Sequence, residues 1–447
     1  MKLTYGVKDK PPVGRVLVFA FQQLLAILAA TIAVPSIVGN GMSQSAALFG
    51  AGVGTIVYLL FTKFKSPVFL GSSFAFIGSM LAAFAGATSA AAGHAGLIIG
   101  AIFAGLVYVV IAVVVKIAGV KWINKLMPAV VIGPTVAIIG LSLAGNAISD
   151  FSTGNVSHEV DGVLVQNASP YICMICGLVT LLVTITCSVY GKKMLKMIPF
   201  IIGICAGYAV AAIFTVIGNS ADIAALQIID FSKFQNMQWL PAFTFAKAFD
   251  GFKDITPEFI ATIAVAYVPV AFVVFAEHIA DHKNLSSIID SDLLEEPGLH
   301  RTLLGDGVGS VFGALFGGCP NTTYGESVGC VAISGNASVV TILATAIMCM
   351  VASFVAPFTT FLATIPSCVM GGVCITLYGF IAVSGLKMIQ SVDLGQNKNL
   401  FVVSVILIAG IGGMTVSFNA VTLTEVACAL ILGIIVNLIV SPKKDEE

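Results

Sequence analysis

The sequence predicts an all-α protein that crosses a lipid bilayer many times, and three observations lead to this fold class. Hydrophobic residues make up 58% of the 447-residue chain and charged residues only 10%, and the mean hydropathy is +1.04. Apolar runs long enough to cross a bilayer as helices recur from Leu17 to Val440. We count about 14 such runs of roughly 20 residues each, with only short polar breaks between them. No large soluble domain fits into these breaks.

The basic residues at the breaks predict the orientation of the chain. No small-residue cleavage site follows the first apolar run, so we expect this run to remain as a span rather than to be a signal peptide. Lys and Arg concentrate in cytoplasmic loops. Counting spans from a cytoplasmic N-terminus places five basic stretches in the cytoplasm. They are the start of the chain (Lys2, Lys8, Lys10, Arg15), FTKFKS (Lys63, Lys65), KIAGVKWINK (Lys116, Lys121, Lys125), YGKKMLK (Lys192, Lys193, Lys196) and the terminal SPKKDEE.

The break from Asn146 to Pro170 supports the same count. It contains Asp150, Glu159 and Asp161 without one Lys or Arg, and it falls outside. We therefore expect an even number of spans, both termini in the cytoplasm and a location in the cytoplasmic membrane. The net charge of −1 gives no reason to expect a nucleic-acid partner.

Two distant segments indicate an internal repeat. MPAVVIGPTVAIIGLSLAG and IPSCVMGGVCITLYGFIAVSG each open with a proline, Pro128 or Pro366, and have a glycine five residues later, Gly133 or Gly371. Two halves of about seven spans each must have opposite orientations, as in the inverted repeats of many secondary transporters. We expect a first repeat over 1–217, an extracellular connection over 218–256 and a second repeat over 257–447. The alternative is that two Pro-Gly helices match by chance.

Two polar stretches interrupt apolar runs and predict discontinuous helices. FLGSSFAFIGS (69–79) and CPNTTYGE (319–326) are rich in glycine and hydroxyl residues, and Pro320 disfavours helical geometry just before it. We expect each stretch to be a short extended segment that leads into a half-helix starting within the membrane. Such backbone is tolerated there only where protein covers it or where it lines a cavity. A kinked structural helix is the alternative, especially for 71–79.

Two carboxylates, Glu277 and Glu326, lie within apolar runs, where an ionisable group predicts a functional site. Asp281 lies four residues after Glu277, so both acids share one face of a helix. His278 and His282 repeat this spacing on the adjacent face. For Asp281 two interpretations stay open, a site residue or the solvated cytoplasmic end of the helix, and for His282 the solvated end is favoured.

The remaining candidates have structural explanations. Glu425 suits the positive end of a helix dipole. The Cys173-Met-Ile-Cys176 pair resembles a metal or redox motif, but cysteine inside an apolar span usually behaves as a small buried hydrophobe. His94, His158 and His300 are expected at loops. The sequence therefore predicts no metal site, no cofactor and no enzyme.

The predicted site suits a small flat molecule. Carboxylates accept hydrogen bonds from N–H groups, and free N–H groups at a half-helix start donate to carbonyl oxygens. A pyrimidine base presents this alternation of N–H and C=O on its edges. Because burial disfavours the charged form of a carboxyl group, one acid could also take up a proton and couple transport to a proton gradient. A hard cation is the chemical competitor, although it usually requires more oxygen ligands.

Three segments of the sequence resemble a known family of transporters. The segment AEHIADHKNLSSIIDSDLLEEPGLHRTLLGDGVGSVFGALFGGCPNTTYGESVG (276–329) is similar to the signature region of the nucleobase–ascorbate transporters, the nucleobase cation symporter-2 family, and most similar to its uracil permease branch. QQLLAILAATIAVP (22–35) and LGSSFAFI (70–77) also match, so the resemblance covers nearly the whole chain.

The resemblance implies a fold, an activity and a set of site residues. The fold would be 14 spans as a 7+7 inverted repeat, with a core domain that holds the substrate and a gate domain that often forms homodimers. The activity would be proton-coupled uptake of a nucleobase. Glu277 and Glu326 would accept from the pyrimidine, Phe74 and Gly325 would donate through their backbone N–H groups, and Tyr324 would line the same turn. Glu277, Asp281 and Tyr378 would take part in proton coupling.

One departure and two alternatives accompany the resemblance. Some uracil permeases carry histidine where this chain has Asp281, a second carboxylate one turn from Glu277. Purine and ascorbate carriers tend to have Gln-Asn in place of Gly325-Glu326, which favours a pyrimidine here without excluding xanthine or uric acid. An anion carrier of the same architecture would be expected to have neutral or cationic residues in place of the two acids.

Overall fold

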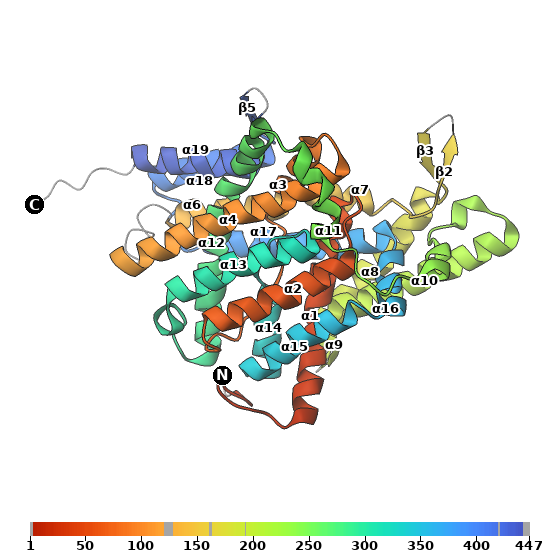
Figure 1. Ribbon diagram of the computed structural model, residues 1–447, viewed down its shortest axis with the longest axis horizontal. Coiled ribbons are helices and arrows are strands. Elements are labelled where there is room, and N and C mark those ends of the chain that lie inside the picture. Colours follow the sequence, from red (N-terminus) through yellow and green to blue (C-terminus); the bar gives the residue numbers. More distant parts are fainter. Residues whose placement is uncertain (1–2, 120–127, 161–162, 193, 419–420, 441–447) are drawn as a thin grey trace, which may run out of the picture.

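The computed structural model describes residues 3–119, 128–160, 163–192, 194–418 and 421–440. Several basic residues used for the orientation (Lys2, Lys121, Lys125, Lys193 and the lysines of SPKKDEE), together with Asp161, lie outside these ranges. Within them the chain is a bundle of helices with three two-stranded ribbons, which confirms the helical membrane-protein class (Figure 1).

The first half of the chain contains nine described helices. Ser43 and Ser89 accept hydrogen bonds from the backbone N–H groups of Ala46 and Ala92, and thereby cap the helices that follow them. The helices are α1 (Val13–Val38), α2 (Gln44–Phe61), α3 (Ile77–Ala85), α4 (Ala90–Ala118), α6 (Ala129–Ser142), α7 (Ala144–Asp150), α8 (Pro170–Tyr190), α9 (Met194–Met197) and α10 (Pro199–Ala221).

The second half follows a connection that holds only short helical turns, among them α11 (Thr244–Ala248). Thr256 accepts from the N–H of Phe259 and caps the 33-residue helix that opens this half. The helices are α12 (Pro257–Ile289), α13 (Leu299–Gly317), α14 (Gly325–Ser334), α15 (Val339–Ala352), α16 (Ala356–Thr364), α17 (Ser367–Ile389), α18 (Asn397–Ile411) and α19 (Glu425–Val440).

Three ribbons complete the described chain. β1 (Leu70–Ser72) pairs antiparallel with β4 (Asn321–Thr323), so that Gly71 lies opposite Thr322. The hairpins β2–β3 (Ser157–Val160, Val163–Gln166) and β5–β6 (Val416–Phe418, Val421–Leu423) join neighbours in sequence. Only β1–β4 brings distant parts of the chain together.

Eight described helices are long and apolar enough to cross a membrane: α1, α2, α4, α6 with α7, α8, α10, α12 and α17. The pair α15 and α16 would add a ninth span, bent by 83°. The count from the sequence, about 14, is higher for a physical reason. α3 and α14 are half-helices of 9 and 10 residues, α13 contains Arg301 and Asp306, and α18 and α19 are short.

The helices pack as two groups. In one, α1 to α4 contact α12 to α15, and in the other, α6, α8 and α10 contact α17, α18 and α19. Close packing in the first group depends on glycine. A Cβ at Gly50 would lie 2.6 Å from the carbonyl oxygen of Gly313, so α2 and α13 approach closely only because both lack side chains there.

The start of the chain is hydrogen-bonded to the first group of helices. The backbone N–H of Thr4 donates to the carbonyl of Gly335 (2.7 Å), and that of Ala337 donates to the carbonyl of Tyr5 (2.9 Å). Gly335 directly follows α14, so the N-terminal segment is fastened to the end of this half-helix.

Candidate substrate site

The β1–β4 ribbon positions two half-helices. β1 leads through Phe74 into α3, and β4 leads through Tyr324 into α14, so both stretches are extended and then helical as predicted. Thr55 of α2 holds the ribbon: its hydroxyl donates to the carbonyl of Leu70 (3.1 Å) and accepts from the N–H of Leu70 (2.9 Å). The phenol of Tyr324 donates to the carbonyl of Ser72 (2.8 Å), which ties the two half-helix starts together.

These starts leave backbone donors free. Gly325 is the first residue of α14, so its N–H has no partner within the helix. The N–H of Phe74 has no backbone acceptor among the described residues. Glu326 lies in the first turn of α14 and is only half-buried.

α12 brings the other acids to the same place. Glu277 and Asp281 lie one turn apart and are half-buried, and Asp281 accepts a hydrogen bond from the hydroxyl of Thr323 (2.6 Å). The helix continues to Ile289, so the interpretation of Asp281 and His282 as its solvated end is wrong. His282 is fully buried.

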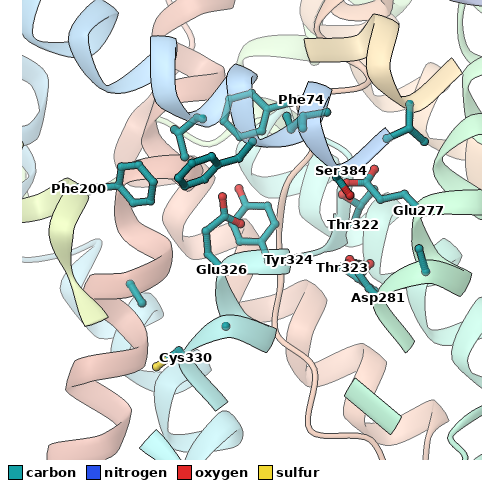
Figure 2. A pocket seen from close by; sticks show the side chains of 18 of the residues that line it. Phe74, Phe200, Glu277, Asp281, Thr322, Thr323, Tyr324, Glu326, Cys330 and Ser384 are labelled. Atoms are coloured by element: carbon teal, nitrogen blue, oxygen red, sulfur yellow. Dashed lines mark hydrogen bonds between the residues drawn. The ribbon is translucent and has the colours of Figure 1, made fainter. Parts of the chain in front are cut away.

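A cavity of about 330 Å³ lies between these elements. Figure 2 shows Glu277 and Glu326 reaching it from two directions, with Tyr324 between them in this view. Of the residues predicted for substrate binding, Glu277, Glu326, Phe74, Gly325 and Tyr324 all line the cavity, as does Asp281. The described residues contain no group of acids, histidines or cysteines arranged to hold a metal ion.

Tyr378 lies behind the cavity rather than in its lining. Its ring packs edge-to-face on Phe74, with the ring centroids 5.7 Å apart. Its hydroxyl is buried without a hydrogen-bond partner among the described residues. Tyr378 can therefore affect the site through Phe74.

Sequence reasoning missed several residues that build the site. Gln23 of α1 is buried and donates to the hydroxyl of Ser327 (2.6 Å), which fixes α14 beside Glu326. Phe200 and Ser384 come from α10 and α17, in the second group of helices. A buried amide in an apolar run was a usable signal for Gln23, whereas no pattern in the sequence marks Phe200 or Ser384.

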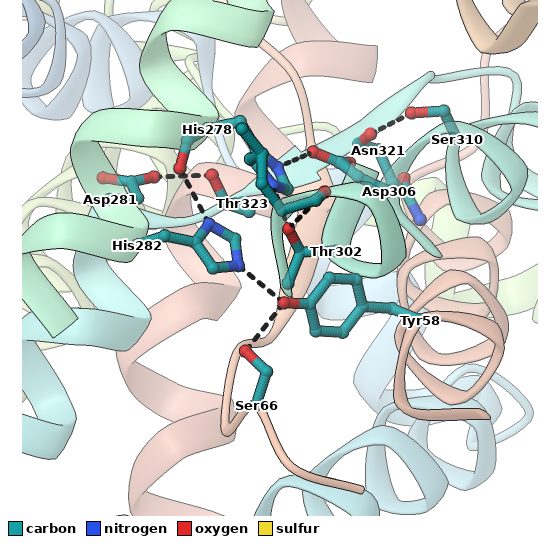
Figure 3. A network of polar contacts seen from close by, with 11 residues as sticks. Tyr58, Ser66, His278, Asp281, His282, Thr302, Asp306, Ser310, Asn321 and Thr323 are labelled. Atoms are coloured by element: carbon teal, nitrogen blue, oxygen red, sulfur yellow. Dashed lines mark hydrogen bonds and ion pairs between the residues drawn. The ribbon is translucent and has the colours of Figure 1, made fainter. Parts of the chain in front are cut away.

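A polar network lies beside the acids, on the adjacent face of α12 (Figure 3). His278 Nδ1 is 2.6 Å from Asp306 Oδ2, and both side chains are fully buried. Asp306 is a further carboxylate within the first group of helices, besides Glu277, Asp281 and Glu326, and the sequence analysis did not identify it. His94 is also buried, in α4, so its predicted place at a loop is wrong.

Comparison with known proteins supports the family. A model described as the permease family matches residues 14–418. The chain is 39% identical to the uracil permease of Bacillus caldolyticus over 441 residues, which cover 98% of this chain and 95% of that protein. It is 37% identical to the uracil permease of Bacillus subtilis (strain 168), over 100% and 97% of the two chains. Identity to the uracil permease of Escherichia coli (strain K12) is 34%, over 97% and 93%.

Solved structures show the fold. The transmembrane domain of the cyanobacterial bicarbonate transporter BicA has a TM-score of 0.61 at 17% identity and covers 97% of this chain and 99% of that domain. A murine anion transporter of the solute carrier 26 family, in its inward-facing state, has a TM-score of 0.65 at 12% identity, over 97% and 69%. The sequence matches and this fold together show that the chain belongs to the permease family of nucleobase–ascorbate transporters, in its uracil permease branch.

Proposed function

We propose that this protein imports uracil across the cytoplasmic membrane together with protons. The observation that carries the proposal is the arrangement of groups around one small cavity. Two carboxylates can accept from the N–H groups of a pyrimidine, and two half-helix starts can donate to its carbonyls. The matched uracil permeases make uracil the first pyrimidine to test.

We assign the proton to the acids of α12. Glu277 and Asp281 lie one turn apart on the cavity side, and Tyr378 borders the site through Phe74. A proton shared among these groups would relieve the repulsion between neighbouring carboxylates while substrate is bound. In this assignment Glu277 both binds uracil and carries the proton, and the neighbouring Asp281 adjusts how tightly Glu277 holds that proton.

We further infer a 7+7 inverted repeat with core and gate domains. Under such a repeat each helix of the first half has a counterpart in the second: α1 and α12, α2 and α13, α4 and α15, α6 and α17, α8 and α18. The contacts between helices then come in equivalent pairs. The contact of α1 with α15 matches that of α12 with α4, α2 with α15 matches α13 with α4, and α6 with α18 matches α17 with α8. The prolines of the sequence repeat, Pro128 and Pro366, precede α6 and α17 in the same way. The first helix group would be the core and the second the gate. The halves would meet at the connection 218–256.

Orientation and assembly belong to the same proposal. The cavity is lined on one side by Lys196 of α9, from a basic break that we place in the cytoplasm. The described state would then be open to the cytoplasm, with both termini inside. We expect any homodimer to form through the gate.

Two alternative functions differ from this proposal in the charge or the identity of the substrate. An anion carrier shares the fold of the solved structures, but the acids at the cavity would repel an anion. A xanthine or uric acid carrier of the same family would use the same acids and differ only in substrate.

The test is uptake of labelled uracil into proteoliposomes of the purified protein, with and without an inward proton gradient. Accumulation that collapses when a protonophore is added is the expected result. Uptake of xanthine instead of uracil would overturn the substrate, and uptake that is indifferent to the gradient would overturn the coupling.

A further inference from the structure

His282 is held by two hydrogen bonds that define its protonation. Its Nδ1 lies 2.7 Å from the backbone carbonyl oxygen of His278. A carbonyl oxygen only accepts, so Nδ1 carries a hydrogen. The other ring nitrogen, Nε2, lies 2.7 Å from the phenol oxygen of Tyr58 on α2.

The chain of hydrogen bonds continues to the segment before β1. The phenol oxygen of Tyr58 lies 2.7 Å from the hydroxyl of Ser66. With neutral His282, Ser66 donates to Tyr58 and Tyr58 donates to Nε2, so every ring nitrogen and the phenol are satisfied (Figure 3). All three side chains are fully buried.

A charged His282 would have no counter-ion. Its hydrogen-bond partners among the described residues are a carbonyl and a hydroxyl, and the ring stacks on His278 with the centroids 4.0 Å apart. The nearby carboxylate of Asp306 is bonded to His278 instead. An unpaired charge in such a site costs several kcal/mol, so His282 remains neutral.

The neutral chain closes a circuit that borders the substrate site at Asp281 and Thr323. On the cavity side of α12, Asp281 is bonded to Thr323 of β4. β4 pairs with β1, and Ser66 lies on the segment that enters β1. From Ser66 the circuit returns through Tyr58 to His282, the residue after Asp281. α12 is thus held on two faces, and its rotation decides where Glu277 points.

We propose that His282, Tyr58 and Ser66 form a positioning unit for the acids of α12, and that His282 carries no proton during transport. The inference rests on the proposed transport function and deepens it. The unit sets the distance between α12 and the β1–β4 ribbon, and therefore substrate affinity. The proton is left to the carboxylates on the adjacent, cavity-facing side of the helix.

The test separates affinity from coupling. Tyr58→Phe and Ser66→Ala each remove one hydroxyl of the hydrogen-bond chain and should raise the KM for uracil about tenfold. Ser66→Ala leaves the Tyr58 oxygen without its donor, and Tyr58→Phe leaves both His282 Nε2 and the Ser66 hydroxyl without their partner. The pH profile of the maximal rate and the proton-driven accumulation should stay as in the wild type. His282→Leu should act like Tyr58→Phe, and His282→Gln, which offers a neutral donor and acceptor, should recover most of the affinity.

A matched control lies nearby. The hydroxyl of Tyr108 is buried without a partner among the described residues. Tyr108→Phe should therefore leave KM unchanged. Melting temperatures in detergent identify any variant that fails to fold, and Ser66→Ala is the smallest change of the set.

Two results would overturn the inference. One is a His282→Gln protein that exchanges uracil but no longer accumulates it against a proton gradient, because His282 would then be a proton carrier. The other is an unchanged KM in both Tyr58→Phe and Ser66→Ala. If the wild type transports a different nucleobase, the proposed substrate fails while the same comparison with that base still tests the positioning unit.

Discussion

At the scale of single residues, the proposed mechanism depends on which acids would hold substrate and which would hold a proton. Glu277 and Glu326 line one cavity from two helices of the second half, α12 and α14, and Asp281 lies beside Glu277 with its own donor, Thr323. The same residue type can serve two roles here because the partners differ.

Replacing either cavity glutamate by glutamine should remove accumulation. Glutamine keeps the shape but replaces an ionised acceptor, and a hydrogen bond to a charged group contributes about 1.5–3 kcal/mol, which corresponds to about 10- to 100-fold in affinity. We expect Glu277→Gln to be the more severe, with Glu326→Gln close behind. Uptake of labelled uracil into proteoliposomes measures both, and wild-type rates in either variant would contradict the site.

Asp281→Asn should separate binding from coupling. The amide oxygen can still accept from Thr323, but asparagine removes the carboxylate that tunes Glu277, so gradient-driven accumulation should fall while uracil exchange persists. Counterflow of labelled against unlabelled uracil measures the exchange. If accumulation stays intact in Asp281→Asn, Asp281 only holds Thr323. Thr323→Val is the matched variant, since it removes the donor and leaves the carboxylate.

At the scale of elements, the ribbon and its two half-helices are held by α2 and α13. Asn321 of β4 donates through its side-chain amide to the carbonyl of Gly50 (3.0 Å). A Cβ at Gly313 would overlap the side chain of Asn321. The glycines of α13 thus make room for a residue of the binding ribbon as well as for α2.

Gly313→Ala should destabilise the protein and weaken binding together. Overpacking costs about 1–3 kcal/mol, so the melting temperature in detergent should fall by a few degrees and the KM for uracil should rise. Gly379→Ala is the control, because a Cβ there meets nothing within 4 Å. Equal melting temperatures in the two variants would show that Asn321 can move away without loss.

Elements also show what the sequence could and could not predict. The stretches 69–79 and 319–326 were identifiable because Pro320 and the hydroxyl residues contradict a continuous helix. The pairing of β1 with β4 was not, since no local pattern specifies a partner far along the chain. Asp306 and the burial of His282 were missed for a related reason: Asp306 in α13 and His282 in α12 resemble solvated residues until their partners, His278 and Tyr58, are known.

At the scale of the whole molecule, the proposed orientation gives the cavity a cytoplasmic lining that the substrate would pass. Ser384 and Lys196 contribute to this lining, from α17 and α9. A separate cleft of about 310 Å³ lies near the opposite end of α17 and is lined by Gln44 and Met370. The two hollows would be the inner and outer approaches to one site.

Labelling of introduced cysteines should show which of the two hollows opens to the cytoplasm and which to the outside. A membrane-impermeant maleimide should modify Ser384→Cys from the cytoplasmic side, and uracil should protect it. Gln44→Cys should react from the outer side instead. The unmodified chain gives the background, because most of its ten cysteines are buried. Labelling of Ser384→Cys from outside alone would reverse the proposed orientation.

The pairing of β1 with β4 also has a consequence for biosynthesis. Ser72 and its partner Tyr324 are 252 positions apart, so the ribosome completes the first strand long before the second one exists. Backbone groups left unpaired in hydrocarbon cost several kcal/mol. The newly made first half must therefore shelter Leu70–Ser72 with its own helices or with the insertion machinery. We expect the first half, made alone, to insert into membranes, yet to be cleared by quality-control proteases until its missing strand is supplied as a separate polypeptide.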